Sequence, residues 1–109
     1  MKVYTFLTDG FETVEALAVI DILRRAGIEV ETVSITGNEQ VCSAQNITVK
    51  ADTLFKAQPV CKEDVLFLPG GPGHKQYNEC KPLLKLLEKH HAEGGRIAAI
   101  CAAPSVLGA

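Results

Sequence analysis

The sequence predicts an α/β fold in which a mostly parallel β-sheet is covered by helices on both faces. The main observation is that strand-like and helix-like segments alternate along the chain, which is the pattern of consecutive βαβ units. The 109 residues are 47% apolar and 22% charged, as is typical of a globular chain with one core. No repeat or low-complexity segment interrupts the alternation, so residues 1–109 are interpreted as a single domain.

The first βαβ unit occupies the N-terminal third of the chain. Residues 2–7 and residues 28–35 are apolar, β-prone runs that predict strands. Between them, apolar residues recur at helical spacing up to Gly27, which can adopt the left-handed conformation that ends a helix. Asp9 and Glu12 have the three-residue spacing of a capping box, so we expect them to cap this helix.

The middle of the chain is less periodic. Residues 41–43 and 47–50 are short β-prone runs that indicate a hairpin, either at the edge of the sheet or over it. Residues 65–68 are apolar and precede the turn sequence Pro-Gly-Gly-Pro-Gly at positions 69–73. A buried central strand is therefore predicted to end at this turn.

A second helix and a further strand complete the pattern. Pro82 suits the first turn of an amphipathic helix that ends at the two glycines 94 and 95, and residues 96–100 then predict the next buried strand. Residues 104–109 resemble the start of another helix. A doubly wound domain normally has more elements, so we expect the chain to lack its C-terminal elements. The apolar face of the amphipathic helix contains Leu83, Leu86, Leu87 and His90.

Cys101 is the first candidate for chemistry. It follows a predicted strand and precedes small residues and Pro104, so it lies at a strand-to-helix elbow. Backbone N–H groups at a helix N-terminus stabilise a thiolate and lower the pKa of the thiol, which makes such a cysteine nucleophilic and easily oxidised. The alternative is that Cys101 is a small apolar residue at the end of a buried strand.

Glu15 is the second candidate, because it lies in an otherwise apolar part of the first predicted helix. Burying an ionised carboxylate is costly, so this side chain needs a partner or a proton. A protonated Glu15 could donate a hydrogen bond to a thiolate and exchange a proton during a reaction. The alternative is a solvated carboxylate near the helix start, where the helix dipole favours acidic residues.

Backbone amides could complete this site. Two glycines, at positions 70 and 71, follow the predicted central strand, and the lack of side chains there would let N–H groups approach an oxyanion. The amides of Gly71 and Ala102 could form an oxyanion hole, and a simple tight turn is the alternative explanation of the glycines. The turn has neither the G-x-G-x-x-G spacing nor the lysine of a P-loop, which argues against nucleotide binding.

Charge and cysteine usage argue against several classes of protein. The formal net charge is -2, from 11 basic and 13 acidic residues without a basic stripe, so neither nucleic acid nor a membrane is an expected partner. No apolar run approaches the roughly 20 residues of a transmembrane helix and no signal-peptide pattern is found, so a cytoplasmic location is expected. The four cysteines and three histidines lack the spacing of a metal site, and no metal is predicted.

Four motifs follow one another along the chain: Asp9-Gly10-Phe11-Glu12-Thr13-Val14-Glu15, Asp21-Ile22-Leu23-Arg24-Arg25-Ala26-Gly27, Leu68-Pro69-Gly70-Gly71 and Ala98-Ala99-Ile100-Cys101-Ala102. Together and in this order they resemble the ThiJ/PfpI superfamily, and in particular its parkinsonism-associated deglycase branch. The resemblance covers essentially the whole chain. It implies a flavodoxin-like, three-layer α/β/α sandwich with further elements beyond residue 109.

The resemblance also implies a function. Cys101 would be the reactive cysteine, Glu15 the acid hydrogen-bonded to it, and Gly71 and Ala102 the backbone donors. Family activities include glutathione-independent conversion of methylglyoxal to lactate, proposed repair of early glycation adducts, chaperone-like behaviour and oxidation of the cysteine to sulfinate in oxidative stress. The implied partners are a small carbonyl substrate such as methylglyoxal and a second copy in a homodimer, with no cofactor. Cys42 matches a second cysteine near the dimer contact, and an ordinary surface thiol is the alternative.

Two features depart from the family pattern. Relatives contribute a histidine near the cysteine from beyond the point that corresponds to residue 109, so none of the three histidines here is given that role. His90 and His91 are interpreted as helix-surface or boundary residues, and His74 is left without a role. Ala103 stands where close relatives often have glycine.

Two functional hypotheses remain open. In the first, the Cys101 thiolate of an enzyme attacks an aldehyde carbon and Glu15 transfers the proton. In the second, a non-catalytic redox sensor or chaperone uses the same thiolate as an oxidant trap. A glutamine-amidotransferase or peptidase relative is disfavoured, because those families take their acid from later in the chain than Glu15.

Overall fold

A parallel five-stranded sheet forms the centre of the computed structural model, which describes residues 1–56 and 59–99. β1 (Lys2–Leu7) pairs with β2 (Glu29–Ser34) on one side and with β6 (Val65–Leu68) on the other, and every pair of neighbouring strands in this sheet is parallel. The predicted mostly parallel sheet is confirmed. In spatial order its strands are β5 (Thr53–Leu54), β2 (Glu29–Ser34), β1 (Lys2–Leu7), β6 (Val65–Leu68) and β7 (Arg96–Ala99).

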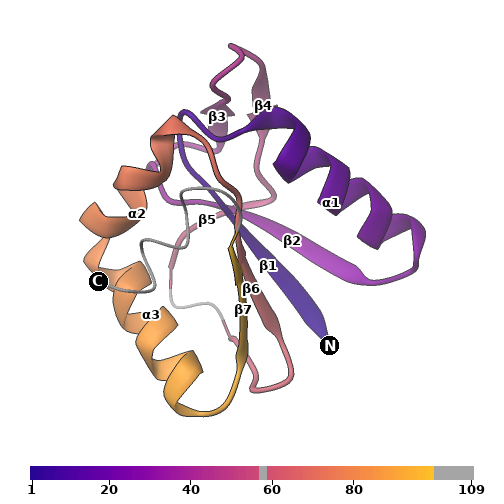
Figure 1. Cartoon of the computed structure of the whole chain (residues 1–109), viewed down its shortest axis with the longest axis vertical. Helices are drawn as coiled ribbons and strands as arrows, with labels where there is room; N and C mark the ends of the chain where they lie inside the picture. The colour runs from indigo at the N-terminus through magenta and orange to yellow at the C-terminus, as the bar shows by residue number, and fades with distance from the viewer. Residues whose placement is uncertain (57–58, 100–109) are drawn as a thin grey trace.

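Helices lie on both faces of this sheet (Figure 1). α1 (Thr13–Arg25) connects β1 to β2 on one face, whereas α2 (Lys75–Glu79) and α3 (Lys81–Ala92) connect β6 to β7 on the other. The two crossovers run in opposite directions from the middle of the sheet, and right-handed crossovers of opposite direction place their helices on opposite faces. The described chain thus has the predicted three α/β/α layers. No helix within it has the length and apolarity needed to cross a membrane.

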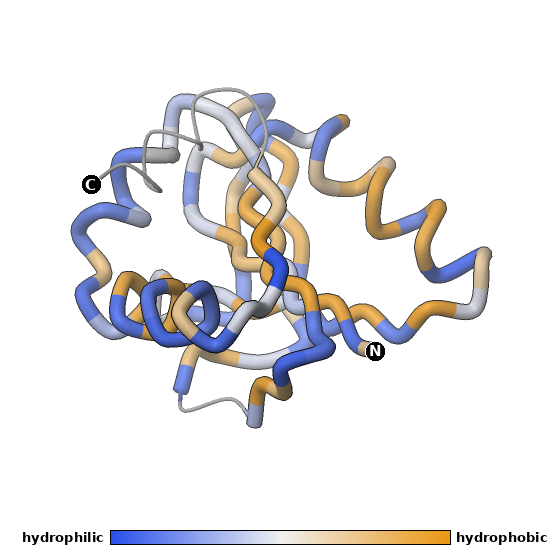
Figure 2. The backbone as a smooth tube through the Cα atoms, turned by 60° about the horizontal axis from the view of Figure 1, so that its bottom comes forward, coloured by the Kyte–Doolittle hydropathy of each residue, from blue (hydrophilic) through white to orange (hydrophobic). Residues whose placement is uncertain are grey.

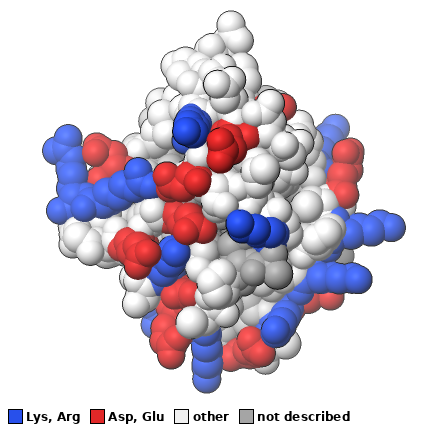
Figure 3. All heavy atoms as spheres, turned by 180° about the vertical axis from the view of Figure 1, so that it is seen from behind, with Lys and Arg blue, Asp and Glu red and all other residues white. Residues whose placement is uncertain are grey.

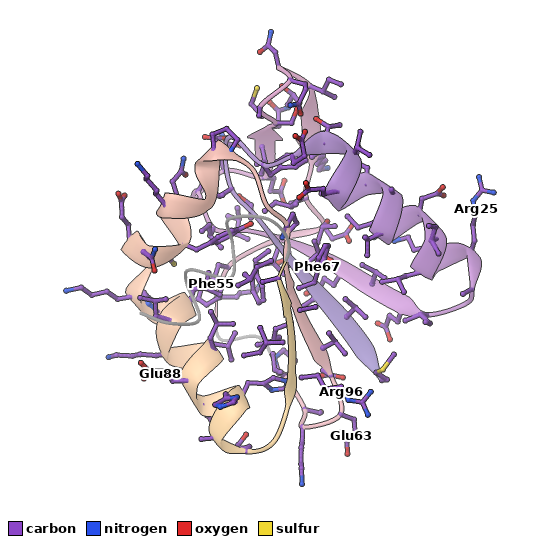
Figure 4. All side chains as sticks on the ribbon, viewed as in Figure 1. Arg25, Phe55, Glu63, Phe67, Glu88 and Arg96 are labelled. Atoms are coloured by element: carbon purple, nitrogen blue, oxygen red, sulfur yellow. The ribbon has the colours of Figure 1, made fainter. Side chains whose placement is uncertain are left out.

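Each face of the sheet has its own apolar core, because successive side chains of a strand point to opposite faces. Tyr4 and Phe6 of β1 belong to the core beneath α3, against which Phe55 packs. Val3 of the same strand and Phe67 of β6 belong to the core beneath α1. Figure 4 shows Phe55 and Phe67 on opposite sides of the sheet, and in Figure 2 the central strands are the largely hydrophobic part of the tube.

The strand order indicates where a ligand would bind. Without the two-residue edge strand β5, the order β2-β1-β6-β7 matches the start of the 2-1-3-4-5 order of flavodoxin-like sheets. The direction of progression across the sheet reverses between β1 and β6. In open α/β sheets, ligands bind outside the carboxyl ends of the strands at this switch point, which here means the loops after β1 and β6.

A separate antiparallel hairpin is formed by β3 (Gln40–Cys42) and β4 (Thr48–Lys50). The predicted hairpin is confirmed. The sequence left open whether it lies at the edge of the main sheet or over it, and in the structure it does not join the edge. It is attached to the loop after β1 by a bridge between Phe11 and Ser43 and by the N–H of Ala44, which donates to the carbonyl of Phe11 at 2.8 Å.

Three short elements were not predicted: β5, α2 and the 3-10 turn η1 (Pro72–His74). Each is too short to show a hydrophobic period of its own. β7 is not the buried strand that was expected, since Arg96 and Ala98 are exposed. Both side chains lie on the face of the sheet that carries α1. They are exposed because α1 packs over β2 and not over β7. Ile100 and the helix start predicted at residues 104–109 lie outside the described residues.

The predicted capping box at the start of α1 is wrong. Glu12 is the N-cap residue, but its own side chain makes no capping hydrogen bond. Asp9 Oδ1 instead accepts a hydrogen bond from the backbone N–H of Cys42 at 3.0 Å. The carboxylate therefore ties the loop after β1 to the hairpin. The other end of α1 is as predicted, since Gly27 has a φ of 80°.

His90 is buried, contrary to its interpretation as a surface or boundary residue. Its side chain is 3% exposed, and Nε2 lies 2.8 Å from the backbone carbonyl oxygen of Asp64. Because a carbonyl only accepts, Nε2 must carry the proton. The Asp64 carboxylate accepts from the backbone N–H groups of Lys2 and Cys61, at 2.9 and 2.8 Å. These contacts hold the amino end of β6, opposite the expected ligand site, and His91 is exposed as predicted.

Candidate active site

Two loops meet at the carboxyl ends of β1 and β6. We call residues 8–12 the β1 loop and residues 69–73 the glycine loop. The N–H of Glu12 donates to the carbonyl of Gly70 at 2.9 Å, and the N–H of Gly73 donates to the carbonyl of Gly10 at 3.1 Å. These backbone contacts join the two loops at the switch point of the sheet.

Glycine is needed at positions 71 and 73 because the backbone of the β1 loop lies directly against them. A Cβ on Gly71 would lie 2.5 Å from the carbonyl oxygen of Gly10, and its φ of 116° is a value that other residues rarely adopt. A Cβ on Gly73 would lie 2.0 Å from the carbonyl oxygen of Asp9. The glycines are thus explained by contact between loops, and the role of the Gly71 amide as an oxyanion donor stays a prediction.

Glu15 lies in the first turn of α1, directly after the β1 loop. Val19 and Leu23, four and eight residues further on, share its flank of the helix and pack against the core that contains Phe67 of β6. Glu15 therefore lies on the flank of α1 that faces this core. The residue is half-buried and its Oε1 atom is shielded from solvent, so it is not the fully solvated carboxylate of the alternative interpretation.

Cys101 and Ala102 lie outside the described residues, so their place in the site stays a prediction. β7 pairs with β6 as far as Ala99, which lies opposite Leu68. In the sequence, Cys101 follows Ala99 by two residues, just as Gly70 follows Leu68. The strand that precedes Cys101 is therefore the neighbour of the strand that precedes the glycine loop.

Gln76 is a polar contact of the site that sequence reasoning missed. It lies on α2, and its Nε2 donates to the backbone carbonyl of Asp9 at 3.0 Å. Its Oε1 accepts a hydrogen bond from the hydroxyl of Thr8, whose side chain is buried. No local signal marks this residue, because it belongs to a helix of five residues and bonds to a segment 67 positions earlier.

Tyr77 supports the same region from within the core. It is fully buried, and its hydroxyl lies 2.8 Å from the carbonyl oxygen of Phe6 and 3.2 Å from that of Pro69. Burial raises the pKa of the Tyr77 phenol, so the hydroxyl stays protonated and can donate to these carbonyls. Tyr77 therefore holds the last part of β1 and the start of the glycine loop beneath α2.

An open pocket of about 770 Å³ lies beside the β1 loop on the side of α2. Its described lining has two carboxylates and no basic side chain. Nowhere in the described residues do three or more His, Cys, Asp or Glu side chains group in a way that could hold a metal ion. The pocket is lined by Asp9, Ile35, Thr36, Gln76, Glu79, Cys80 and Pro82.

Comparison with known proteins identifies the family. The model of the DJ-1/PfpI family matches residues 1–109. The chain is 39% identical to Protein dj-1beta of Drosophila melanogaster over 102 residues. This alignment covers 93% of this chain and 54% of that protein. It is 33% identical over 96 residues to a Caenorhabditis elegans protein described as glutathione-independent glyoxalase DJR-1.2. This second alignment covers 88% of this chain and 51% of the relative.

The solved structures agree with the sequence comparison. The structure of Toxoplasma gondii DJ-1 in an oxidized form superposes with a TM-score of 0.89 at 38% identity, covering 96% of this chain and 58% of the other. The chain thus spans slightly more than half the length of these three relatives. The resemblance seen in the four sequence motifs and the flavodoxin-like fold are both confirmed. This chain belongs to the DJ-1/PfpI family.

Proposed function

We propose that the protein is a glutathione-independent, glyoxalase-type enzyme that acts on small dicarbonyls or on glycation adducts. The observation that carries the proposal is the position of Glu15, a shielded carboxylate at the start of α1, beside the two loops at the switch point of the sheet. The similarity to the Caenorhabditis elegans protein described as a glutathione-independent glyoxalase supports the same reaction.

In the proposed reaction, the Cys101 thiolate attacks the aldehyde carbon of methylglyoxal. A carbon–sulfur bond forms, and the carbonyl oxygen becomes an alkoxide that the amides of Gly71 and Ala102 stabilise. Glu15 then transfers a proton between substrate atoms. Water then hydrolyses the resulting thioester, which breaks the carbon–sulfur bond and releases lactate and the Cys101 thiolate. In sum one water is added, the aldehyde carbon is oxidised and the ketone carbon is reduced in the same molecule. The reaction therefore needs no redox cofactor.

The test is the formation of lactate from methylglyoxal by the full-length protein. We expect turnover by the wild type and a loss of at least about 100-fold in Cys101→Ser and in Glu15→Gln, because each removes a group that acts on the substrate. Glu88→Gln is the matched control, since it makes the same chemical change on the exposed surface of α3 (Figure 4). Turnover that survives in Glu15→Gln would rule out the assigned proton transfer.

A redox sensor or chaperone is the second candidate. It is favoured by the similarity to a Toxoplasma gondii structure described as oxidized. A thiolate of this kind can be oxidised through sulfenic to sulfinic acid without any turnover of a carbonyl substrate. If the wild type makes no lactate while Cys101 is oxidised readily by peroxide, as measured by mass spectrometry, this function replaces the enzyme.

We also propose that the protein forms a homodimer through α1 and the β3–β4 hairpin. Val14, Ala18 and Ile22 follow one another at four-residue spacing on the outer face of α1 and are exposed, Val14 by 73% and Ile22 by 64%. The side chain of Gln45 accepts hydrogen bonds from the backbone and hydroxyl of Thr13, which brings the hairpin beside this face. An exposed apolar surface of this kind is typical of an interface.

The hairpin continues this surface with uncharged side chains. Residues 40–49 contain no charged side chain, and Ile47 is 49% exposed. In Figure 3 the protruding top of the molecule, where the hairpin lies, is almost free of charge, whereas acidic and basic side chains alternate below it. Cys42 is half-buried in this hairpin, with its Sγ 3.5 Å from Asn46 Oδ1, so its predicted place near a dimer contact fits the same surface.

Ile22→Glu is expected to dissociate the dimer. In a two-fold interface the two introduced carboxylates would lie close to one another, and we expect the dimer Kd to rise at least about tenfold. Sedimentation velocity over a range of concentrations measures this change. Ala92→Glu, which adds the same charge at the exposed end of α3, is expected to leave the dimer intact. A wild type that sediments as a monomer at all concentrations would contradict the proposal.

A further inference from the structure

The side-chain amide of Gln76 bonds to the β1 loop at two points. Its Nε2 donates to the carbonyl of Asp9 at 3.0 Å, and its Oε1 accepts from the hydroxyl of Thr8. The carbonyl of Asp9 can only accept, so the amide has one orientation that satisfies both bonds. Gln76 itself follows the glycine loop by three residues. One side chain thus connects the segments that follow β1 and β6.

These bonds reach the part of the β1 loop that touches the glycine loop. The Asp9 carbonyl oxygen is the atom nearest to the Cβ position of Gly73, and the next carbonyl, that of Gly10, accepts from the N–H of Gly73. The position of the Asp9 peptide therefore decides whether the two loops remain in contact.

The contact continues into the first turn of α1. The N–H of Glu12 donates to Gly70, and the carbonyl of Glu12 accepts from the N–H of Ala16 at 3.1 Å. Glu15 lies within this turn. A shift of the β1 loop would therefore move the Glu15 carboxylate relative to Gly71.

We propose that Gln76 is a positioning residue for the candidate active site, because it holds the β1 loop and the first turn of α1 against the glycine loop. The inference rests on the proposed function, since it assigns Gln76 a part in the same reaction. Gln76 acts through Asp9 and Thr8. Because Gln76 is exposed and outside both apolar cores, its replacement should leave the fold intact.

Gln76→Glu is the sharpest test. It keeps the size of the side chain and the acceptor for Thr8, but it replaces the donor to Asp9 by a carboxylate oxygen that faces a carbonyl oxygen. Gln76→Met removes both bonds without adding charge. Asn78→Asp makes the same amide-to-acid change two residues later on the exposed surface of α2 and is the matched control.

Two measurements on the full-length protein separate the contact from its consequence. Hydrogen exchange of the Glu12 and Gly73 amides is expected to accelerate about tenfold in Gln76→Glu and Gln76→Met, because local opening becomes more frequent. The kcat for methylglyoxal is expected to fall about tenfold with KM changed by less than about twofold, since misplacement of a reacting group affects the transition state more than binding. Asn78→Asp should change neither quantity.

Three results bear on whether Gln76 holds the loops and whether that contact serves the reaction. Unchanged amide exchange in both Gln76 variants would mean that the side chain does not hold the loops. Faster exchange with unchanged kcat would mean that Gln76 is a structural tie only. If the wild type does not convert methylglyoxal, the proposed function fails, and the positioning role is then decided by the pH midpoint of Cys101 alkylation. That midpoint should move in Gln76→Met, which adds no charge, in the same direction as in Glu15→Gln, and no movement would reject the inference.

Discussion

Replacing Gly73 by alanine is expected to lower the free energy of unfolding by about 4 kcal/mol, with loss of the proposed activity. The added methyl group would lie 2.0 Å from the Asp9 carbonyl oxygen, a backbone atom that cannot rotate away. Overpacking of this kind costs roughly 1–3 kcal/mol. Separation of the loops would also break the bonds from Gly73 to Gly10 and from Glu12 to Gly70, at roughly 0.5–1.5 kcal/mol each.

Urea denaturation of the full-length protein measures this effect, and Gly27→Ala is its control. Gly27 has a φ of 80°, but nothing lies within 4 Å of its Cβ position, so alanine there is expected to cost only about 1 kcal/mol of backbone strain. Gly73 has no positive φ, so an argument from backbone conformation alone would predict the opposite order. Equal losses in the two variants would contradict the close contact between the loops.

Asp64→Ala is expected to lower the free energy of unfolding by about 3 kcal/mol. The Asp64 carboxylate is buried and accepts from the N–H groups of Lys2 and Cys61. Both bonds are partly buried, and a hydrogen bond to a charged group contributes roughly 1.5–3 kcal/mol. The bond from His90 goes to the backbone carbonyl of Asp64 and survives the substitution, so the loss reports the carboxylate alone.

The control for Asp64 is its neighbour in the chain. Glu63 is exposed and projects away from the sheet in Figure 4, so Glu63→Ala is expected to change stability by less than about 0.5 kcal/mol. Asp64→Asn keeps the shape and one acceptor oxygen, and its stability should lie between those of the wild type and Asp64→Ala. If Asp64→Ala and Glu63→Ala were equally stable, the carboxylate would not be holding the amino ends of β1 and β6.

Two failures of sequence reasoning in this chain, the capping box and His90, follow one pattern. Asp9 and Glu12 have the spacing of a local cap, but Asp9 accepts from Cys42, 33 residues later. His90 was placed on the apolar face of its helix with Leu83 and Leu87, and all three are buried there. The polar ring of His90 nevertheless suggests a surface position. Its burial cannot be predicted locally, because the carbonyl that accepts from the ring belongs to Asp64, 26 residues earlier. Each error concerns a polar group whose partner is distant in the chain.

The order of the main elements and the family are both predictable from the amino-acid sequence alone. β1 and β6 have the predicted bounds and β2 lies within its predicted run, because the spacing of apolar residues along a segment is a local property. Glu15 and Gly71 were chosen as site residues on chemical type and motif alone, and their roles, like those of Cys101 and Ala102, await the tests above.

Which segments meet at the switch point depends on the packing of the folded chain. The contact of Gly73 with Asp9, the two bonds of Gln76 and the attachment of the hairpin to the β1 loop all join residues far apart in the chain. A hydrogen bond across 67 residues leaves no periodic trace near either partner, because both ends are ordinary polar groups until packing brings them together.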